Sequence, residues 1–141
     1  MKYFLFILLV VVFYSCATKK TVNIPDVEQS IDAWHQAAAQ ANFENYFNLM
    51  TDEGVFIGTD ATENWKLAEF KAFSKPYFDT GKAWSFTSLE RHVYAQNDIV
   101  YFDELLDTQM GICRGSGVMK MQNGTWKIAH YVLSIAVPND N

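Results

Sequence analysis

Several motifs that would assign a chemistry directly are missing from this chain of 141 residues. It has no glycine-rich phosphate loop, and no group of His, Cys and carboxylate residues has the spacing of a zinc site. Gly115-Ser116-Gly117 is the nearest approach to a nucleophile elbow, but it lies within a predicted strand rather than at a strand-to-helix turn. We therefore predict no metal site and no cofactor.

An excess of basic residues is also missing, since 11 Lys and Arg stand against 16 Asp and Glu. The sequence shows no basic stripe, so we predict no nucleic-acid partner. Half of the residues are hydrophobic and 16% are aromatic, which is ample for the core of a single domain.

The N-terminal segment MKYFLFILLVVVFYSC has one Lys and then an apolar run of about a dozen residues, fewer than the about 20 that span a bilayer. Such a run is typical of a signal peptide. Its end at Ser15-Cys16 resembles the lipobox of bacterial lipoproteins, in which the cysteine is lipidated and becomes the first mature residue. The resemblance implies a signal peptide over residues 1–15, a lipidated Cys16 with a tether over 16–25, and a domain over 26–141. An uncleaved membrane anchor is the alternative.

The lipoprotein resemblance also implies a location and a cysteine inventory. We expect the domain to be lipid-anchored in the bacterial cell envelope, at the periplasmic side of the outer membrane. Removal of residues 1–15 takes away Lys2 and leaves 10 basic and 16 acidic residues, a net charge of −6. With Cys16 lipidated, Cys113 has no disulfide partner in the chain, and we predict that it is a small core residue.

Three helices are predicted before the sheet. A capping box beginning at Asp26 and apolar residues at spacings of three and four predict the first helix. The apolar stripe changes phase at Asn42, which predicts a second helix ending near Thr51, and a third is predicted over residues 67–77. His35 lies off the apolar stripe as we trace it and is predicted to be a surface residue.

A short strand is predicted at residues 55–57, and from Trp84 onward apolar residues alternate, which indicates strands. Asn97-Asp98 and Asn123-Gly124 have the composition of hairpin turns. The four long predicted strands cover residues 84–95, 99–108, 112–121 and 125–137. Helices followed by antiparallel strands predict an α+β fold.

The turn at Asn123-Gly124 fixes a register for the last hairpin if the strands are regular. Counting from this turn pairs Met121 with Trp126 and Gly117 with His130, all on the side that faces the helices. His130 is then either a core histidine with one hydrogen bond or the floor of a cavity that Gly117 leaves open. We treat Gly117 and Trp126 as candidate ligand-binding residues on this basis.

Counting from Asn97-Asp98 pairs Arg91 with Glu104 and His92 with Asp103. One pair must face inward and the other outward, and we favour Arg91 and Glu104 as the inward pair because their strand neighbours are the more apolar. An inward ion pair needs a wet cavity or a close hydrogen-bond network, because buried charge is costly. Regular register points Arg114 away from His130, whereas a bulge in the adjacent Gly115–Gly117 segment would bring it to the pocket.

Several segments together resemble SnoaL-like domains of the nuclear transport factor 2-like (NTF2-like) superfamily, to which ketosteroid isomerase is distantly related. These segments are FIGTDATENW, GKAWSF, YFDELLD, CRGSGVM and WKIAHYVLSIAVPND. The resemblance implies a curved antiparallel sheet wrapped around helices as a cone, an internal pocket, and a homodimer through the outer sheet face, with Tyr131 and Leu133 buried there. It makes Phe56, Trp65 and Trp84 candidates for the pocket wall. Catalytic members use an acidic base with hydrogen-bond donors, and no motif carrying those residues is matched here.

The sequence leaves three functions open. The first is a binding domain for a small, largely apolar molecule without catalysis, as a pocket with few polar groups suggests. The second is a cofactor-independent isomerase, cyclase or hydratase in which His130 is the acid or base, Glu104 or Asp60 orients it, and Arg91 stabilises an oxyanion. The third is a structural or protein-interaction module whose cavity is filled by its own side chains.

Overall fold

The computed structural model describes residues 21–139. Helices α1 (Ile24–Ala39) and α2 (Phe43–Asn48) come first, followed by strands β1 (Met50–Ile57) and β2 (Asn64–Lys66) and helix α3 (Leu67–Asp79). Four long strands complete the fold: β3 (Thr87–Gln96), β4 (Ile99–Thr108), β5 (Gly111–Gln122) and β6 (Thr125–Ile135). The predicted α+β class is therefore confirmed, and the predicted elements occur in the expected order, with β2 in addition.

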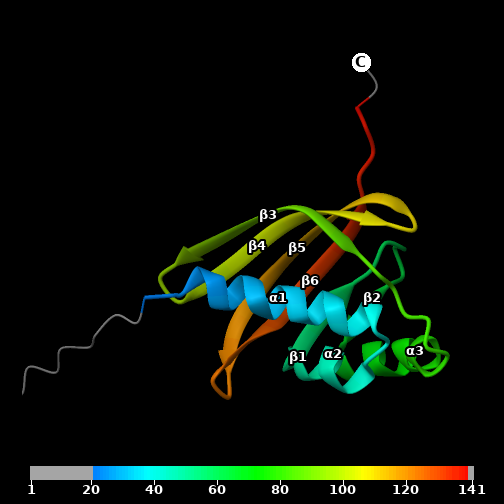
Figure 1. Ribbon diagram of the computed structural model, residues 1–141, viewed down its shortest axis with the longest axis horizontal. Helices are drawn as coiled ribbons and strands as arrows, with labels where there is room; N and C mark the ends of the chain where they lie inside the picture. The colour runs from blue at the N-terminus through cyan, green and yellow to red at the C-terminus, as the bar shows by residue number, and fades with distance from the viewer. Residues whose placement is uncertain (1–20, 140–141) are drawn as a thin grey trace, which may run out of the picture.

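The six strands form one sheet in the order β2-β1-β6-β5-β4-β3, in which only β1 and β6 run parallel. The sheet curves, and α1 lies across its concave side while α2 and α3 gather near β1 and β2 (Figure 1). This is the expected cone-like arrangement, in which the edge strands β2 and β3 do not pair with each other. None of the helices within residues 21–139 has both the length and the apolar character that crossing a membrane requires.

Several predicted boundaries are wrong. The first helix begins at Ile24 with Asn23 as its cap, and no side chain caps it, so the predicted capping box at Asp26 does not form. The second helix ends at Asn48 because the chain enters β1 at Met50, where Ile128 donates its backbone N–H to the carbonyl of Leu49 at 2.8 Å. Strand β2 was not predicted, and the strand expected from residue 84 begins only at residue 87.

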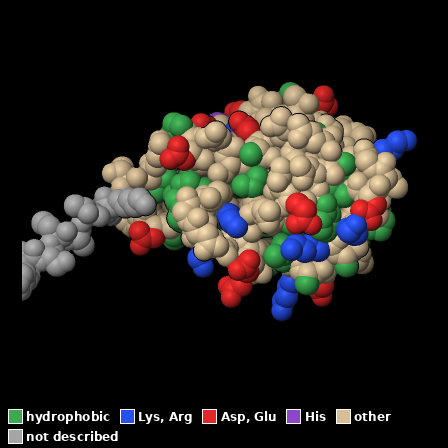
Figure 2. Space-filling model, turned by 60° about the horizontal axis from the view of Figure 1, so that its bottom comes forward, with side chains coloured by type: hydrophobic (Ala, Val, Ile, Leu, Met, Phe, Trp, Pro, Cys, Tyr) green, Lys and Arg blue, Asp and Glu red, His purple; other side chains and the backbone are tan. Residues whose placement is uncertain are grey.

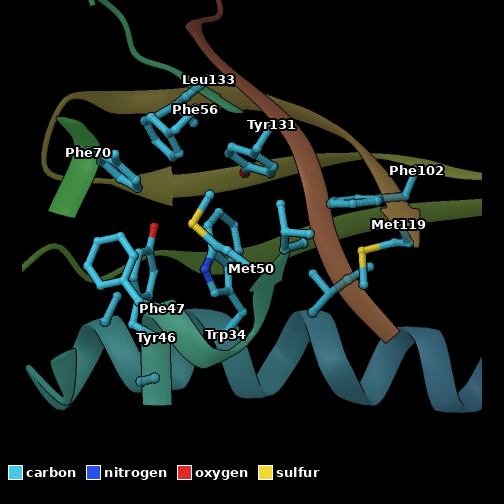
Figure 3. Packing of buried hydrophobic residues seen from close by; sticks show 14 of the residues in the cluster. Trp34, Tyr46, Phe47, Met50, Phe56, Phe70, Phe102, Met119, Tyr131 and Leu133 are labelled. Atoms are coloured by element: carbon cyan, nitrogen blue, oxygen red, sulfur yellow. The ribbon is translucent and has the colours of Figure 1, made fainter. Parts of the chain in front are cut away.

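Apolar side chains from all three helices meet the concave side of the sheet. Trp34 stacks on Tyr46 with ring centroids 4.9 Å apart, and it makes an edge-to-face contact with Tyr131 at a centroid distance of 4.8 Å. Figure 3 shows Phe56, Phe70 and Tyr131 on the sheet side of these helix residues. Cys113 is fully buried in this core, as predicted. On the face shown in Figure 2, acidic and basic side chains are interspersed.

The last strand carries a bulge that changes which residues face inward. Met119 pairs with Ile128 as expected, but Val118 pairs with His130 and Gly117 with Tyr131, so Ala129 has no partner in the ladder. An extra residue in one strand moves the residues beyond it to the opposite face. The predicted inward orientation of His130 is therefore wrong.

The same bulge turns Tyr131 and Leu133 into the core, where they are 0% and 4% exposed. Their predicted burial on the outer face of the sheet is therefore wrong. Lys120 and Lys127 do pair directly across β5 and β6.

Candidate functional site

A pocket of about 150 Å³, lined mainly by aromatic rings, lies at the end of the sheet where β1, β2 and α3 meet. We call it the aromatic pocket. Its floor is formed by Phe56 and Phe70, which are 6% and 1% exposed, while Phe73 stands at its rim with 37% exposure. The complete lining is Phe56, Gly58, Thr59, Glu63, Trp65, Phe70, Phe73, Trp84, Phe86, Gln109, Met110 and Leu133.

The rings of this pocket hold one another in place. Phe56 and Phe70 are stacked with centroids 4.1 Å apart, and Trp65 stacks on Phe73 at 4.3 Å. Trp84 lies nearly parallel to Phe70, with an interplanar angle of 20° and a centroid distance of 5.8 Å. Offset stacking stabilises such pairs by about 0.5–1.5 kcal/mol each beyond burial, so the lining is largely formed before any ligand arrives.

Three segments outside the regular elements complete the pocket. They are the β1–β2 loop at residues 58–63, the stretch before β3 at residues 84–86, and the β4–β5 turn at residues 109–110. The Thr59 hydroxyl lies 3.8 Å from the Met110 sulfur, which links the first segment to the third. Loops on a rigid frame are common positions for binding residues.

A group of hydrogen-bonded charged and polar side chains lies inside the cone around Glu104. We call it the Glu104 network. His35 Nε2 lies 2.6 Å from Glu104 Oε1, the Tyr131 hydroxyl donates to the same oxygen at 2.9 Å, and Arg91 Nε donates to Oε2 at 2.9 Å. Arg91 Nη1 also donates to Asp32 Oδ1 at 2.7 Å. The Glu104 side chain has no exposed area, and those of His35 and Arg91 are each 9% exposed.

The pKa values within the Glu104 network are perturbed by burial and by the partners. Burial raises the pKa of Glu104, but the hydrogen bond and charge of His35, the charge of Arg91 and the Tyr131 bond outweigh it, so that the net pKa is lowered. Burial, followed by the charge of Glu104, raises the pKa of Tyr131 well above its usual range. Burial works to lower the pKa of Arg91, yet its two carboxylate partners raise it overall. Glu104 is therefore a carboxylate near neutral pH, and Tyr131 a neutral donor.

His35 was predicted to lie on the surface, and this prediction is wrong, since the residue is 8% exposed. The signal that could have revealed it is its position four residues after Ile31, which places both side chains on one helix face. His35 and Arg91 line a separate hollow of about 280 Å³ between α1 and the start of β3. Phe86 lines both this hollow and the aromatic pocket.

The inward orientation of Arg91 and Glu104 was predicted correctly. Among the other acid–base candidates, His130 points away from the core, and Asp60 lies in the exposed β1–β2 loop. Hydrogen bonds from the Thr62 hydroxyl and backbone lower the pKa of Asp60. The structure therefore does not bring His130 together with Glu104 or Asp60.

Three of the predicted ligand-binding residues, Phe56, Trp65 and Trp84, do line the aromatic pocket. Arg114 is exposed opposite Leu105, because the bulge lies in β6 and not in the Gly115–Gly117 segment.

The other two ligand-binding candidates lie elsewhere. A side chain at Gly117 would meet the Phe102 ring at 2.6 Å, so the cavity expected beside Gly117 is filled. Trp126 lies by a different hollow, near the start of α1. Within residues 21–139, no three His, Cys, Asp or Glu side chains are grouped as metal ligands.

Comparison with known proteins assigns the chain to a family. The chain matches the family described as SnoaL-like domain over residues 27–138 and belongs to it. No curated protein matches the chain in sequence.

The fold is shared with several solved structures at low identity. An NTF2-like protein of unknown function from Pseudomonas putida KT2440 is 17% identical with a TM-score of 0.68, covering 81% of this chain and 87% of its own. A proposed dehydratase of the NTF2-like family from Streptomyces avermitilis is 15% identical with a TM-score of 0.68, covering 82% and 96%. A proposed ketosteroid isomerase from Shewanella frigidimarina NCIMB 400 is 17% identical with a TM-score of 0.64, covering 77% and 94%. These similarities support the NTF2-like fold and no particular activity.

Proposed function

We propose that this SnoaL-like domain binds a small, largely apolar ligand in the aromatic pocket and does so without catalysis. The observation that carries the proposal is the pocket itself, whose six aromatic rings come from strands, a helix and loops. Binding sites for small molecules are typically apolar concavities with a few polar groups, here Thr59, Glu63 and Gln109. At about 150 Å³ the pocket is smaller than the about 300–1,000 Å³ typical for drug-sized ligands, which favours a small group.

The proposal includes a lipid anchor at Cys16 in the cell envelope. This part rests on the sequence MKYFLFILLVVVFYSC, which lies outside the described residues. A homodimer through the outer face of the sheet is also proposed. In its support, Tyr94, Tyr101 and Val118 are 43%, 40% and 38% exposed there, and the two tyrosine rings stack at 5.1 Å.

Native mass spectrometry of the protein purified from its own host tests ligand binding. We expect a reproducible added mass that disappears in Thr59→Trp, whose indole would occupy the mouth of the pocket. Ala72→Trp is the matched control, because Ala72 is exposed on α3 and does not line the aromatic pocket. Retention of the added mass in Thr59→Trp, or its loss in both variants, would place the ligand elsewhere.

The short contact between His35 and Glu104 favours a second candidate, an acid–base enzyme that needs no cofactor. A buried carboxylate that holds one ring nitrogen of a histidine orients the ring and leaves the other nitrogen to exchange a proton. In this alternative His35 takes the role that the sequence suggested for His130. Substrate would enter the hollow beside His35 and Arg91.

This alternative is tested by incubating the protein with a small-molecule extract of its host and following compounds that are consumed. His35→Gln should abolish consumption, whereas His92→Gln, which alters the exposed His92–Asp103 pair, should not. Equal consumption by both variants would eliminate the alternative.

A further inference from the structure

The aromatic pocket contains one charged side chain in its lining, the carboxylate of Glu63. No Lys, Arg or His is among the residues that line it. The other side chains are six aromatic rings, Thr59, Gln109, Met110 and Leu133. The electrostatic character of this pocket is therefore set by aromatic rings and by one negative charge.

Glu63 is held at the pocket by the geometry of the β1–β2 loop. The Gly58 N–H donates to the Glu63 carbonyl at 2.9 Å, and the Asp60 N–H donates to the side-chain Oε2 at 3.2 Å. The carboxylate folds so closely over Gly58 that a Cβ atom there would collide with it. A side chain at position 58 would therefore displace the half-buried Glu63 carboxylate from its place beside the rings.

A second acidic residue in the same loop adds to the negative field. The Asp60 carboxylate accepts hydrogen bonds from the Thr62 hydroxyl and the Thr62 N–H, at 2.6 Å and 2.8 Å, and these bonds lower its pKa. Asp60 is exposed and does not line the pocket. It lies between Thr59 and Glu63 in the same loop, and its negative charge favours the approach of a positive charge.

The faces of aromatic rings carry partial negative charge and attract cations, most strongly in the case of tryptophan. Trp65 and Trp84 both line the pocket. A ligand anion would be repelled by the Glu63 carboxylate, whereas an alkylated ammonium group would be attracted by Glu63 and by the ring faces that it contacts, and would still bury apolar surface.

We propose that the aromatic pocket selects an organic cation, namely an ammonium group whose substituents are small alkyl groups. This inference rests on the proposed ligand-binding function and names the class of ligand. The rings supply apolar contact and cation–π attraction, and Glu63 supplies the counter-charge. The small volume fits a head group of this kind better than a fused ring system.

A matched pair of probes separates charge from shape. Choline and 3,3-dimethylbutan-1-ol have nearly the same size and differ in the positive charge. Isothermal titration of the full-length chain in dodecyl maltoside should show choline binding more tightly by about twofold to thirtyfold, the range that cation–π contacts provide. Glu63→Gln keeps an oxygen that can accept from the Asp60 N–H, and it should remove much of this preference without weakening the neutral probe.

Glu53→Gln is the control for net charge, since Glu53 is exposed on β1 and lies outside the aromatic pocket. It should leave the preference for choline unchanged. Equal or tighter binding of the neutral alcohol would overturn the inference and leave the apolar ligand-binding function standing. Binding of neither probe would also overturn it, while an added mass that Thr59→Trp removes would still support ligand binding.

Discussion

Replacement of Glu104 by Gln removes the charge at the centre of the Glu104 network with little change in volume. Glu104 contacts His35, Tyr131 and Arg91 through its two oxygens and has no exposed side-chain area. A glutamine side chain can accept with only one of its two terminal atoms, so at least one of these donors loses its acceptor. Arg91 is then left with a single carboxylate, from Asp32.

The expected loss of stability follows from the burial of the network. Removal of one partner from a buried ion pair typically costs about 3–5 kcal/mol, against a total of about 5–15 kcal/mol for a domain. With a urea m-value of about 1–3 kcal/mol/M, the unfolding midpoint should fall by at least about 1 M. Urea denaturation of wild type and Glu104→Gln, followed by circular dichroism, measures this shift.

Asp103→Asn is the matched control, because Asp103 is the next residue of β4 and also pairs with a residue of β3. Its partner His92 lies 3.2 Å away, and the two side chains are 32% and 50% exposed. An exposed pair of this kind contributes about 0–1 kcal/mol. If the two substitutions cost the same, desolvation of Glu104 cancels its attractions, and the Glu104 network does not stabilise the fold.

Three further predictions concern the Glu104 network, the packing of Tyr131 on β5, and the N-terminus. Because folding lowers the pKa of Glu104, its stabilisation should be complete above the unfolded value of about 4.3 and lost as the pH falls below it. The difference in unfolding free energy between wild type and Glu104→Gln, measured against pH, tests this. A difference that grows toward acid pH would have the wrong sign. Gly115→Ala should cost about 1–3 kcal/mol, because its Cβ would collide with the Tyr131 hydroxyl, and the cost should be smaller in Tyr131→Phe, as a double-mutant cycle in urea can show. Cys16→Ser should remove the acyl mass that the wild-type protein carries at its N-terminus, as mass spectrometry can show, and absence of an acyl mass from the wild type would refute lipidation at this residue.

The sequence predicted strand pairing well where a two-residue turn fixes the register. Counting from Asn97-Asp98 gave the pairs Arg91 with Glu104 and His92 with Asp103, and both are present. The inward choice was also correct, because the more apolar set of neighbours faces the core. The ladder keeps its register from the turn back to Glu90, and shifts only beyond it at Leu89, so a local turn signal determined these contacts.

The same method failed in β6 because an inserted residue leaves no mark in the alternation. Ala129 is small and lies between Ile128 and His130, in a stretch with apolar residues on both sides of the sheet. Neither glycine nor proline marks the bulge. The regular count placed His130 inward, whereas the bulge places Tyr131 there, where its hydroxyl meets Glu104. A buried carboxylate that needs donors is the tertiary constraint that counting along one strand could not include.

Two glycines of β5 show that an absent side chain does not have to leave a cavity such as the one predicted at Gly117. Tyr131 lies over Gly115, and the Phe102 ring lies over Gly117, so the chain uses both spaces for its own aromatic residues. Glycine on an inward face therefore indicates close approach of another group, and a ligand is only one such group. The aromatic pocket instead lies where three loop segments meet the end of the sheet, and the backbone path of loops cannot be counted from a turn. Substitution at Gly117 should consequently lower stability and leave ligand binding unchanged, because the Phe102 ring fills the space beside it. Substitution at Thr59 should weaken ligand binding and leave stability unchanged, because Thr59 is exposed and lines the aromatic pocket.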